Sequence, residues 1–349
     1  MSYPFKSVCL KFILVLGLLQ FWLISKSQYD FGEVDKLLKT NQKALGNNLA
    51  VMIYKGDKIV YQKEIGEFKI KTKAPLASAS TWLTAALVMT FVDEGKLSLD
   101  EKISTYLPIF DNYSKSYITI RQCLAQETGI ANNHRTVVKM FERNKFESLE
   151  DEVNSFAKRE IAANPGTTFF YGDIGLNIAG RVLEVLTKKK FESLMKQRIF
   201  TPLNMRNSSF VPEENAVNPS NGAFSTAADY MNFLSMILAK GVFMGKRILS
   251  EAAIAQMQTI QTTNIPIKYA PKIAEGFEYG LGEWIQQKDA KGNSMVVGCP
   301  SLSGTWPYID NCRGYACIVI VQNLLDEQPR YFYSDLEEAI DKQITGDCK

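Results

Sequence analysis

One stretch near residue 85 constrains the fold more than any other, because apolar residues occupy every side of a helix drawn through it. Its apolar members are Trp82, Leu83, Ala85, Ala86, Leu87, Val88, Met89, Phe91 and Val92. A helix with no polar face belongs in the middle of a domain. The sequence therefore predicts a central, buried helix directly after Ser78-Ala79-Ser80-Thr81.

Ser78 is a candidate nucleophile because of its place at the start of this helix. A serine there has free backbone N–H groups beside it and the positive end of the helix dipole under it, which suits a nucleophile and an oxyanion hole. In the S-x-x-K arrangement a lysine one turn later takes the serine proton. Thr81 holds that position, and a hydroxyl cannot replace an amine as base. Alternatively, Ser78 or Ser80 serves only as the N-cap of the helix.

Composition excludes several functions. The 349 residues are 46% hydrophobic and 22% charged, which suits one large or two intimate domains with a full core. The formal charge of +3 comes from three lysines before residue 28, so no nucleic-acid partner is expected. His134 is the single histidine, which argues against a Ser-His-Asp triad and a histidine metal site. We expect no cofactor and no metal.

The N-terminus resembles a secretory signal. Two lysines precede an apolar run over residues 12–25, shorter than the roughly 20 residues that a membrane-spanning helix needs. Ser25-Lys26-Ser27 offers small residues at the positions that a signal peptidase recognises. We predict a signal peptide over residues 1–27, a mature chain from Gln28, and a secreted or periplasmic protein. The alternative is an uncleaved membrane anchor.

The mature chain would keep an odd number of cysteines, so they cannot all pair within one chain. They are Cys123, Cys299, Cys312, Cys317 and Cys348. Export permits disulfides, but their connectivity stays open.

Strand patterns occur at both ends of the chain and helical patterns between them. Residues 49–65 form a predicted hairpin, and residues 294–298 and 315–322 are predicted as a second hairpin around a Pro/Gly-containing loop. Helical periodicity covers 174–186, 230–238 and 334–344. We predict an α+β fold in which an antiparallel sheet from both termini (about 28–75 and 275–349) is flanked by helices. A mostly helical subdomain (about 76–274) is inserted, so residues 28–349 form one domain.

Two further segments carry candidate chemistry. Tyr171-Gly172-Asp173 precedes a predicted helix, and a tyrosine whose proton is displaced by a cation can serve as a base. Alternatively, Asp173 caps the helix and Tyr171 packs. Residues 298–305 follow a strand that, at a sheet edge, could offer a backbone N–H to an oxyanion, or they form an ordinary hairpin connection.

In order and spacing, these segments resemble the serine β-lactamase and penicillin-binding protein family. The likeness is to the branch of class C β-lactamases, D-alanyl-D-alanine carboxypeptidases and esterases, with a β-lactamase/transpeptidase-like fold. It extends over SASTWLTAALVMTFVDEGKLSLDEKISTYLP (78–108), ITIRQCLAQETGI (118–130), FFYGDIGLNIAGRVLEVLT (169–187), NGAFSTAADYMNFLSMILAKGVFMGKRILS (221–250) and YGLGEW (279–284).

The resemblance implies that Ser78 is acylated and that Tyr171 is its partner base. It places the family lysine at Thr81 and the family asparagine at Asp173, and the Lys-Thr-Gly-type segment at Cys299-Pro300-Ser301. The backbone N–H groups of Ser78 and Leu302 would form the oxyanion hole. Ser301, Leu302, Ser303 and Gly304 would together contact substrate.

The departures from the family pattern fall on the chemistry. Thr81 removes the cation that would hold Tyr171 anionic, and loss of such a base typically costs 10²–10⁴-fold. Asp173 near Tyr171 would raise the pKa of that tyrosine. Ser301 replaces a glycine that lets substrate lie close to the strand.

Two functional interpretations follow. In the first, the chain is a secreted serine hydrolase for amides or esters, weakened by Thr81. In the second, it is an inactive relative that binds a peptide, an ester or a partner protein in the same place. Either way the expected partner is a small molecule or peptide, with a membrane only if the leader stays uncleaved. The sequence does not indicate an oligomeric state.

Overall fold

The computed structural model describes residues 29–132, 146–210, 216–301, 304–325, 330–346 and 348. The predicted signal peptide, its cleavage before Gln28, and His134 lie outside the described residues, so these predictions stay untested. Leu302 and Ser303 lie outside them as well.

Among the described residues, seven strands form the main sheet and six short strands form two-stranded pairs outside it. The sheet strands are β1 (Leu49–Lys55), β2 (Lys58–Ile65), β9 (Glu278–Tyr279), β10 (Trp284–Lys288), β11 (Ser294–Gly298), β12 (Trp306–Asp310) and β13 (Tyr315–Val321). The short strands are β3 (Ala74–Pro75), β4 (Phe169–Phe170), β5 (Phe224–Ser225), β6 (Val242–Phe243), β7 (Lys246–Arg247) and β8 (Ile267–Tyr269).

Most of the helices lie between β3 and β9 in the chain. The α-helices are α2 (Gly32–Asn41), α3 (Ser80–Asp93), α4 (Ile109–Asn112), α5 (Ile120–Leu124), α7 (Leu149–Ala157), α8 (Ile174–Thr187), α9 (Phe191–Met195), α10 (Ala227–Leu238), α11 (Glu251–Met257) and α12 (Tyr331–Asp341). The tighter or wider turns are η2 (Ala77–Ala79), η3 (Ile103–Thr105), η4 (Lys196–Phe200) and η5 (Lys272–Ala274).

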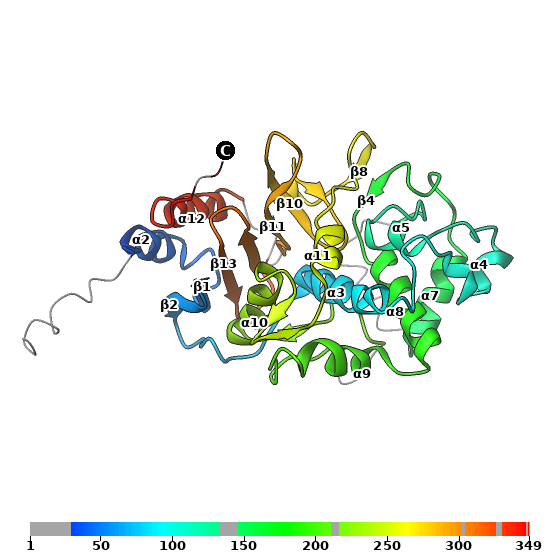
Figure 1. The fold of residues 1–349 in the computed structure, drawn as a ribbon, viewed down its shortest axis with the longest axis horizontal. Helices are drawn as coiled ribbons and strands as arrows, with labels where there is room; N and C mark the ends of the chain where they lie inside the picture. Colours follow the sequence, from blue (N-terminus) through cyan, green and yellow to red (C-terminus); the bar gives the residue numbers. More distant parts are fainter. Residues whose placement is uncertain are drawn as a thin grey trace, which may run out of the picture.

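The main sheet joins the two ends of the chain (Figure 1). Its order is β2-β1-β13-β12-β11-β10-β9, and each neighbouring pair is antiparallel. β1 pairs along its whole length with β13, from Leu49 opposite Val321 to Lys55 opposite Tyr315. The prediction of an α+β fold with an antiparallel sheet from both termini is confirmed.

Helices cover both faces of the sheet (Figure 1). Alternate residues of β1 point to opposite faces. Val51 and Ile53 pack in the cluster that contains α2 and α12, and Ala50 and Met52 pack in the cluster that contains α3 and α10. Because both faces are buried, β1 and β13 are almost continuously apolar.

Helix α3 lies at the centre of the molecule, as predicted (Figure 1). Its residues from Ser80 to Phe91 are all buried. The segment after β9 approaches it closely at Gly282, where φ is +78° and an added Cβ would lie 2.3 Å from Ala85 Cβ. Only glycine fits this contact.

The second predicted hairpin is wrong. β11 and β13 do not pair, because β12 lies between them in the sheet. Pro307 and two nearby glycines suggested a loop, yet Trp306–Asp310 is fully buried strand. β11 is also not an edge strand, since it pairs with β10 and β12. Its pairing with β10 ends at Gly298.

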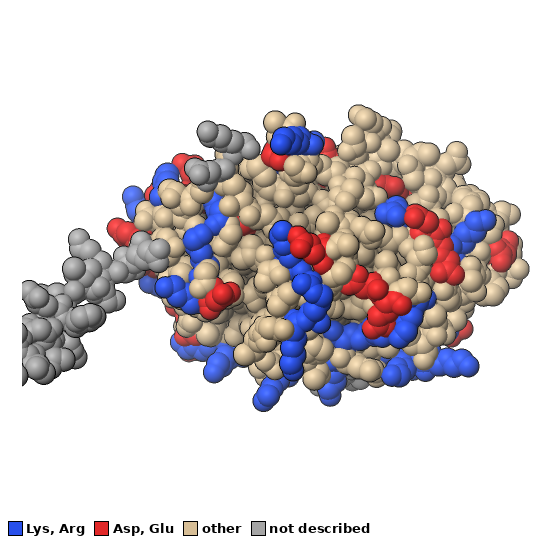
Figure 2. All heavy atoms as spheres, in the orientation of Figure 1, with Lys and Arg blue, Asp and Glu red and all other residues tan. Residues whose placement is uncertain are grey.

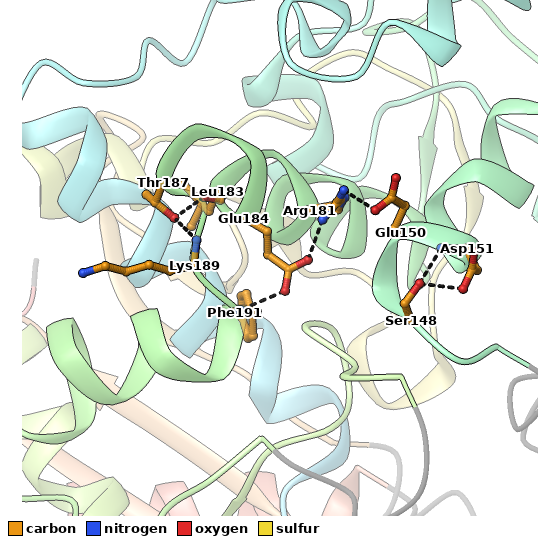
Figure 3. A network of polar contacts seen from close by, with 9 residues as sticks. All are labelled: Ser148, Glu150, Asp151, Arg181, Leu183, Glu184, Thr187, Lys189 and Phe191. Carbon is orange, nitrogen blue, oxygen red and sulfur yellow. Dashed lines mark hydrogen bonds and ion pairs between the residues drawn. The ribbon is translucent and has the colours of Figure 1, made fainter.

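A network of charged groups ties α7 and α8 to the start of α9 (Figure 3). Arg181 pairs with Glu150 and, at 3.1 Å, with the buried Glu184. The other oxygen of Glu184 accepts the backbone N–H of Phe191 at 2.9 Å. The buried carboxylate is therefore satisfied from two sides, as a buried charge requires.

One disulfide joins Cys312, after β12, to Cys348 near the C-terminus. Cys123, Cys299 and Cys317 are free and buried. Basic and acidic side chains are mixed over the face in Figure 2, with basic ones more frequent along its lower edge. Within the described ranges, no helix is both long and apolar enough to span a bilayer.

Candidate active site

Ser78 lies in η2, at the point where the chain enters α3, and is 6% exposed. The preceding Ala77 has φ +46°, a left-handed conformation that is unfavourable for a residue with a Cβ and often marks a functional position. Neither candidate cap is used: Ala79 occupies the N-cap of α3 without a side-chain capping bond. Ser80 Oγ instead donates to Ala77 O at 2.6 Å and accepts from Ala223 N at 3.0 Å.

Thr81 lies one helical turn after Ser78, and its side chain contacts neutral groups. Its Oγ1 lies 3.0 Å from Ser78 O, 2.9 Å from Gly282 O and 3.0 Å from Cys299 Sγ. The hydroxyl is 1% exposed and points at backbone carbonyls, not at Ser78 Oγ. Position 81 therefore connects α3 to the segment before β10, and supplies no base.

Cys299, the residue after β11, contacts both Thr81 and Ser78. Its Sγ lies 3.1 Å from Ser78 O, and its backbone N–H donates to Pro307 O at 3.0 Å. Burial is the main reason that the pKa of this thiol is raised to about 12. Cys299 therefore stays a neutral thiol at pH 7, where the resemblance would place a lysine.

Tyr171 follows β4 and stacks obliquely on Trp284, with ring centroids 5.1 Å apart. Its hydroxyl is buried and has no hydrogen-bond partner within the described ranges. Burial, above all, raises the pKa of Tyr171, and Cys299 and Asp173 add to the rise. The effect expected of Asp173 is found, but desolvation is the larger cause. Tyr171 is therefore protonated at neutral pH and can donate a hydrogen bond, but it cannot act as a base.

Asp173 reaches Ser78 through Asn221. Ser78 Oγ donates to Asn221 Oδ1 at 3.4 Å, and Asn221 Nδ2 donates to Asp173 Oδ1 in a short contact. Asp173 occupies the N-cap position of α8 without a side-chain capping bond. Since an amide cannot take up a proton, this chain orients the serine hydroxyl and does not relay its proton.

The loop after β11 carries the remaining candidate residues. Ser301 is buried, and its N–H donates to Thr305 O at 2.8 Å. Gly304 N–H donates to Ser301 O at 3.2 Å. Leu302, expected to supply one oxyanion donor, lies outside the described residues with Ser303. Among the bonds of the described residues, none takes the backbone N–H of Ser78, so this expected oxyanion donor is free.

A buried acid lies behind this group of residues. Glu283 is fully buried, and both carboxyl oxygens lack partners in the part of the chain that the structure describes. Burial raises the pKa of Glu283 well above its usual range, which favours its neutral form. We call Ser78, Thr81, Tyr171, Asp173, Asn221 and Cys299 the Ser78 site; Asp173 is its one carboxylate residue.

The structure thus brings Ser78, Thr81, Tyr171 and Asp173 together from two separate segments. Sequence reasoning missed Asn221, which lies 143 residues from Ser78 in the chain. It lies in the polar loop before β5, and an asparagine there is typical of an ordinary turn. No local signal indicates its contact with Ser78.

Two cavities lie elsewhere. One of about 470 Å³ is lined by residues 95–101, Arg121 and neighbours, and one of about 160 Å³ lies beside the Arg181–Glu184 pair. Neither is lined by a residue of the Ser78 site. Within the Ser78 site, Asp173 and Asn221 are half-buried and the other four residues are buried.

Sequence comparisons agree with this architecture. The Beta-lactamase family profile matches residues 35–338. Penicillin-binding protein 4 of Amycolatopsis lactamdurans is 30% identical over 207 residues, which cover 50% of this chain and 53% of that protein. Protein flp of Staphylococcus aureus strain N315 is 27% identical over 195 residues, covering 52% of this chain and 39% of that protein. The chain therefore spans about half or less of these relatives.

Solved structures extend the likeness to nearly the whole chain. A candidate β-lactamase from Bacteroides dorei DSM 17855 has a TM-score of 0.81 and 28% identity, covering 90% of this chain and 99% of that one. The octameric penicillin-binding protein homologue from Pyrococcus abyssi has a TM-score of 0.73 and 20% identity, covering 90% of this chain and 79% of that one. This second likeness is one of fold alone.

The fold, with Ser78 at the start of the central helix and Tyr171 beside it, defines the class of β-lactamase-fold serine hydrolases. The family profile covers most of the chain, and the chain belongs to the β-lactamase family.

Proposed function

We propose that this chain is a member of the β-lactamase family that binds a small molecule or peptide at the Ser78 site without turning it over. One observation carries the proposal: among the described residues, no side chain in contact with Ser78 Oγ is a base at neutral pH, and the Asp173 carboxylate reaches Ser78 only through the Asn221 amide. Burial raises the pKa of Tyr171 and of Cys299, and Thr81 is a hydroxyl held by backbone carbonyls.

The magnitude of the deficit favours binding over turnover. A positioned general base contributes about 10²–10⁴-fold to such a reaction. Residues that act as a unit also lose most of their effect when one is removed. Here the lysine is absent and Tyr171 is left protonated, so two parts of the proton path fail together.

Slow hydrolysis is a second candidate function, and two observations favour it. Ser78 keeps a free backbone N–H at the start of α3, and its hydroxyl is oriented by Asn221. An ester with a good leaving group could acylate such a serine slowly.

Covalent labelling separates the two candidates. The purified mature chain is incubated with a fluorophosphonate and with a fluorescent penicillin, and its intact mass is measured, with Ser78→Ala as the control. Non-catalytic binding predicts no adduct on folded protein. An adduct that is lost in Ser78→Ala would overturn it in favour of slow hydrolysis.

A gain-of-function variant tests the assignment of the site. Thr81→Lys, Asp173→Asn and Ser301→Gly are combined with Cys299→Ala, because Cys299 Sγ lies 3.0 Å from Thr81 Oγ1 and occupies the space of a longer side chain. We expect this variant to be labelled by the fluorophosphonate. A folded variant that stays inert would contradict the placement of these segments in one catalytic site.

We also propose that the chain is exported and processed before Gln28. The Cys312–Cys348 disulfide supports this, because disulfides persist in oxidising compartments and are rare in the cytosol. The intact mass of the native protein gives its first residue. Recovery of Met1 would refute the cleavage.

A further inference from the structure

We propose that the Ser78 site selects ligands that carry an ammonium group next to a carbonyl, such as amino-acyl amides or a peptide N-terminus, and rejects carboxylates. This inference rests on the function proposed above. It concerns which ligand class the site takes, and three features of the site support it.

The first feature is the carboxylate of Asp173. Its Oδ1 accepts from Asn221, and no ion pair to Asp173 exists among the described residues. Asp173 is half-buried, so the carboxylate is both reachable and partly shielded from solvent. A cation that approaches it gains more than at a fully exposed site, because screening is weaker there.

The second feature is the absence of a compensating cation in the described part of the site. The positions that the family resemblance assigns to lysines hold Thr81 and Cys299, whose side chains contact each other at 3.0 Å. A ligand carboxylate would therefore face Asp173, and none of the six residues of the Ser78 site carries a positive charge. Like charges at such a site repel, so carboxylate-bearing ligands are disfavoured.

The third feature is the hydroxyl of Tyr171, two residues before Asp173. It is buried and makes no hydrogen bond of good geometry to a described residue, although the hydroxyls of Ser78 and Thr81 lie close enough to lower its pKa. Buried polar groups are normally hydrogen-bonded. A protonated hydroxyl donates, so it suits a carbonyl or ester oxygen of a ligand. Together, Asp173 and Tyr171 match an ammonium group and a nearby carbonyl in one molecule.

The test compares three probes of similar shape and different charge: alanine p-nitroanilide (ammonium), its N-acetyl form (neutral) and its N-succinyl form (anionic). Both stereoisomers are used with the mature chain. Binding is measured by calorimetry and by ligand-observed saturation-transfer NMR. We expect the ammonium probe to bind about fivefold to tenfold more tightly than the neutral one, which is roughly the effect of one partly exposed ion pair. The succinyl probe should bind most weakly.

Variants assign the effect to Asp173. Asp173→Asn keeps an acceptor for Asn221 and should abolish the preference, whereas Asp173→Glu should retain it. Asp111→Asn, an exposed change in α4, is the matched control and should leave the preference unchanged.

Each outcome is decisive. Equal binding of the ammonium and neutral probes, or a preference that survives in folded Asp173→Asn, would overturn the charge selection and leave the proposed binding function intact. Failure of all three probes to bind wild-type protein would overturn the ligand class inferred here, whereas covalent labelling of Ser78 tests the proposed function separately.

Discussion

Thr81→Val tests whether position 81 has become a structural contact between α3 and the segment before β10. Valine has nearly the shape of threonine, so the change removes the hydroxyl and creates almost no cavity. The hydroxyl lies 2.9 Å from Gly282 O and 3.0 Å from Ser78 O, in a position that is 1% exposed. If the hydroxyl anchors this contact, the variant loses stability.

The magnitude follows from the contacts. A net hydrogen bond contributes about 1 kcal/mol, and leaving a buried acceptor unpaired costs about 1–3 kcal/mol. Cys299 Sγ, 3.1 Å from Ser78 O, still serves one of the two carbonyls. We therefore expect Thr81→Val to lower the free energy of unfolding by about 2 kcal/mol.

The assay is urea unfolding at pH 7, followed by tryptophan fluorescence. Thr81→Ser is the matched variant: it keeps the hydroxyl and loses one methyl group, for about 0.8 kcal/mol. The order of stability should be wild type, then serine, then valine. If valine is as stable as wild type and serine is the weakest, position 81 only fills space and the reasoning is refuted.

Three further changes in stability follow from the structure. Burial is the main cause that raises the pKa of Glu337 to about 7, so the folded state favours its protonated form. The stabilising contribution of Glu337 to the free energy of unfolding is fully present below about pH 4.3. It is lost as pH rises to about 7, by up to ~1.4 kcal/mol per pH unit. The free energy of unfolding, measured with urea at several pH values in this range, should fall less steeply with pH in Glu337→Gln than in the wild type. An equally steep fall would disprove the assignment. Arg181→Met leaves the buried Glu184 without its cation (Figure 3) and should lower the free energy of unfolding by about 3 kcal/mol. A loss below about 1 kcal/mol would contradict this role of Arg181. So would a double variant with Glu184→Gln that is no more stable than Arg181→Met. Cys348→Ser opens a loop of sequence separation 36 and should lower stability by up to about 4 kcal/mol, whereas reducing agent should leave this variant unaffected.

Elements with a strong local pattern were predictable. Helix α3 is apolar on all sides, and such a helix is buried in the centre of a domain. The hairpin of β1 and β2 was equally clear, because two strand-like segments flank a Gly-Asp turn. β12 was missed, because Pro307 within a short apolar run normally argues against an interior strand.

The site was only half predictable for a different reason. The sequence shows that Thr81 is no lysine, but not that Cys299, 218 residues away, contacts its hydroxyl. Likewise, Asn221 contacts both Ser78 and Asp173 only after the chain has folded. Such contacts depend on tertiary geometry, and neither periodicity nor spacing encodes them. The Cys312–Cys348 pairing is of the same kind.

The contact between Thr81 and Cys299 also bears on how this lineage can change. A lysine at position 81 alone would place a cation against a neutral thiol and crowd a contact of 3.0 Å. A change at Cys299 alone would remove a neighbour of Ser78 O and restore no base. A lysine at position 81 therefore requires a smaller residue at position 299, and the two positions are expected to change together.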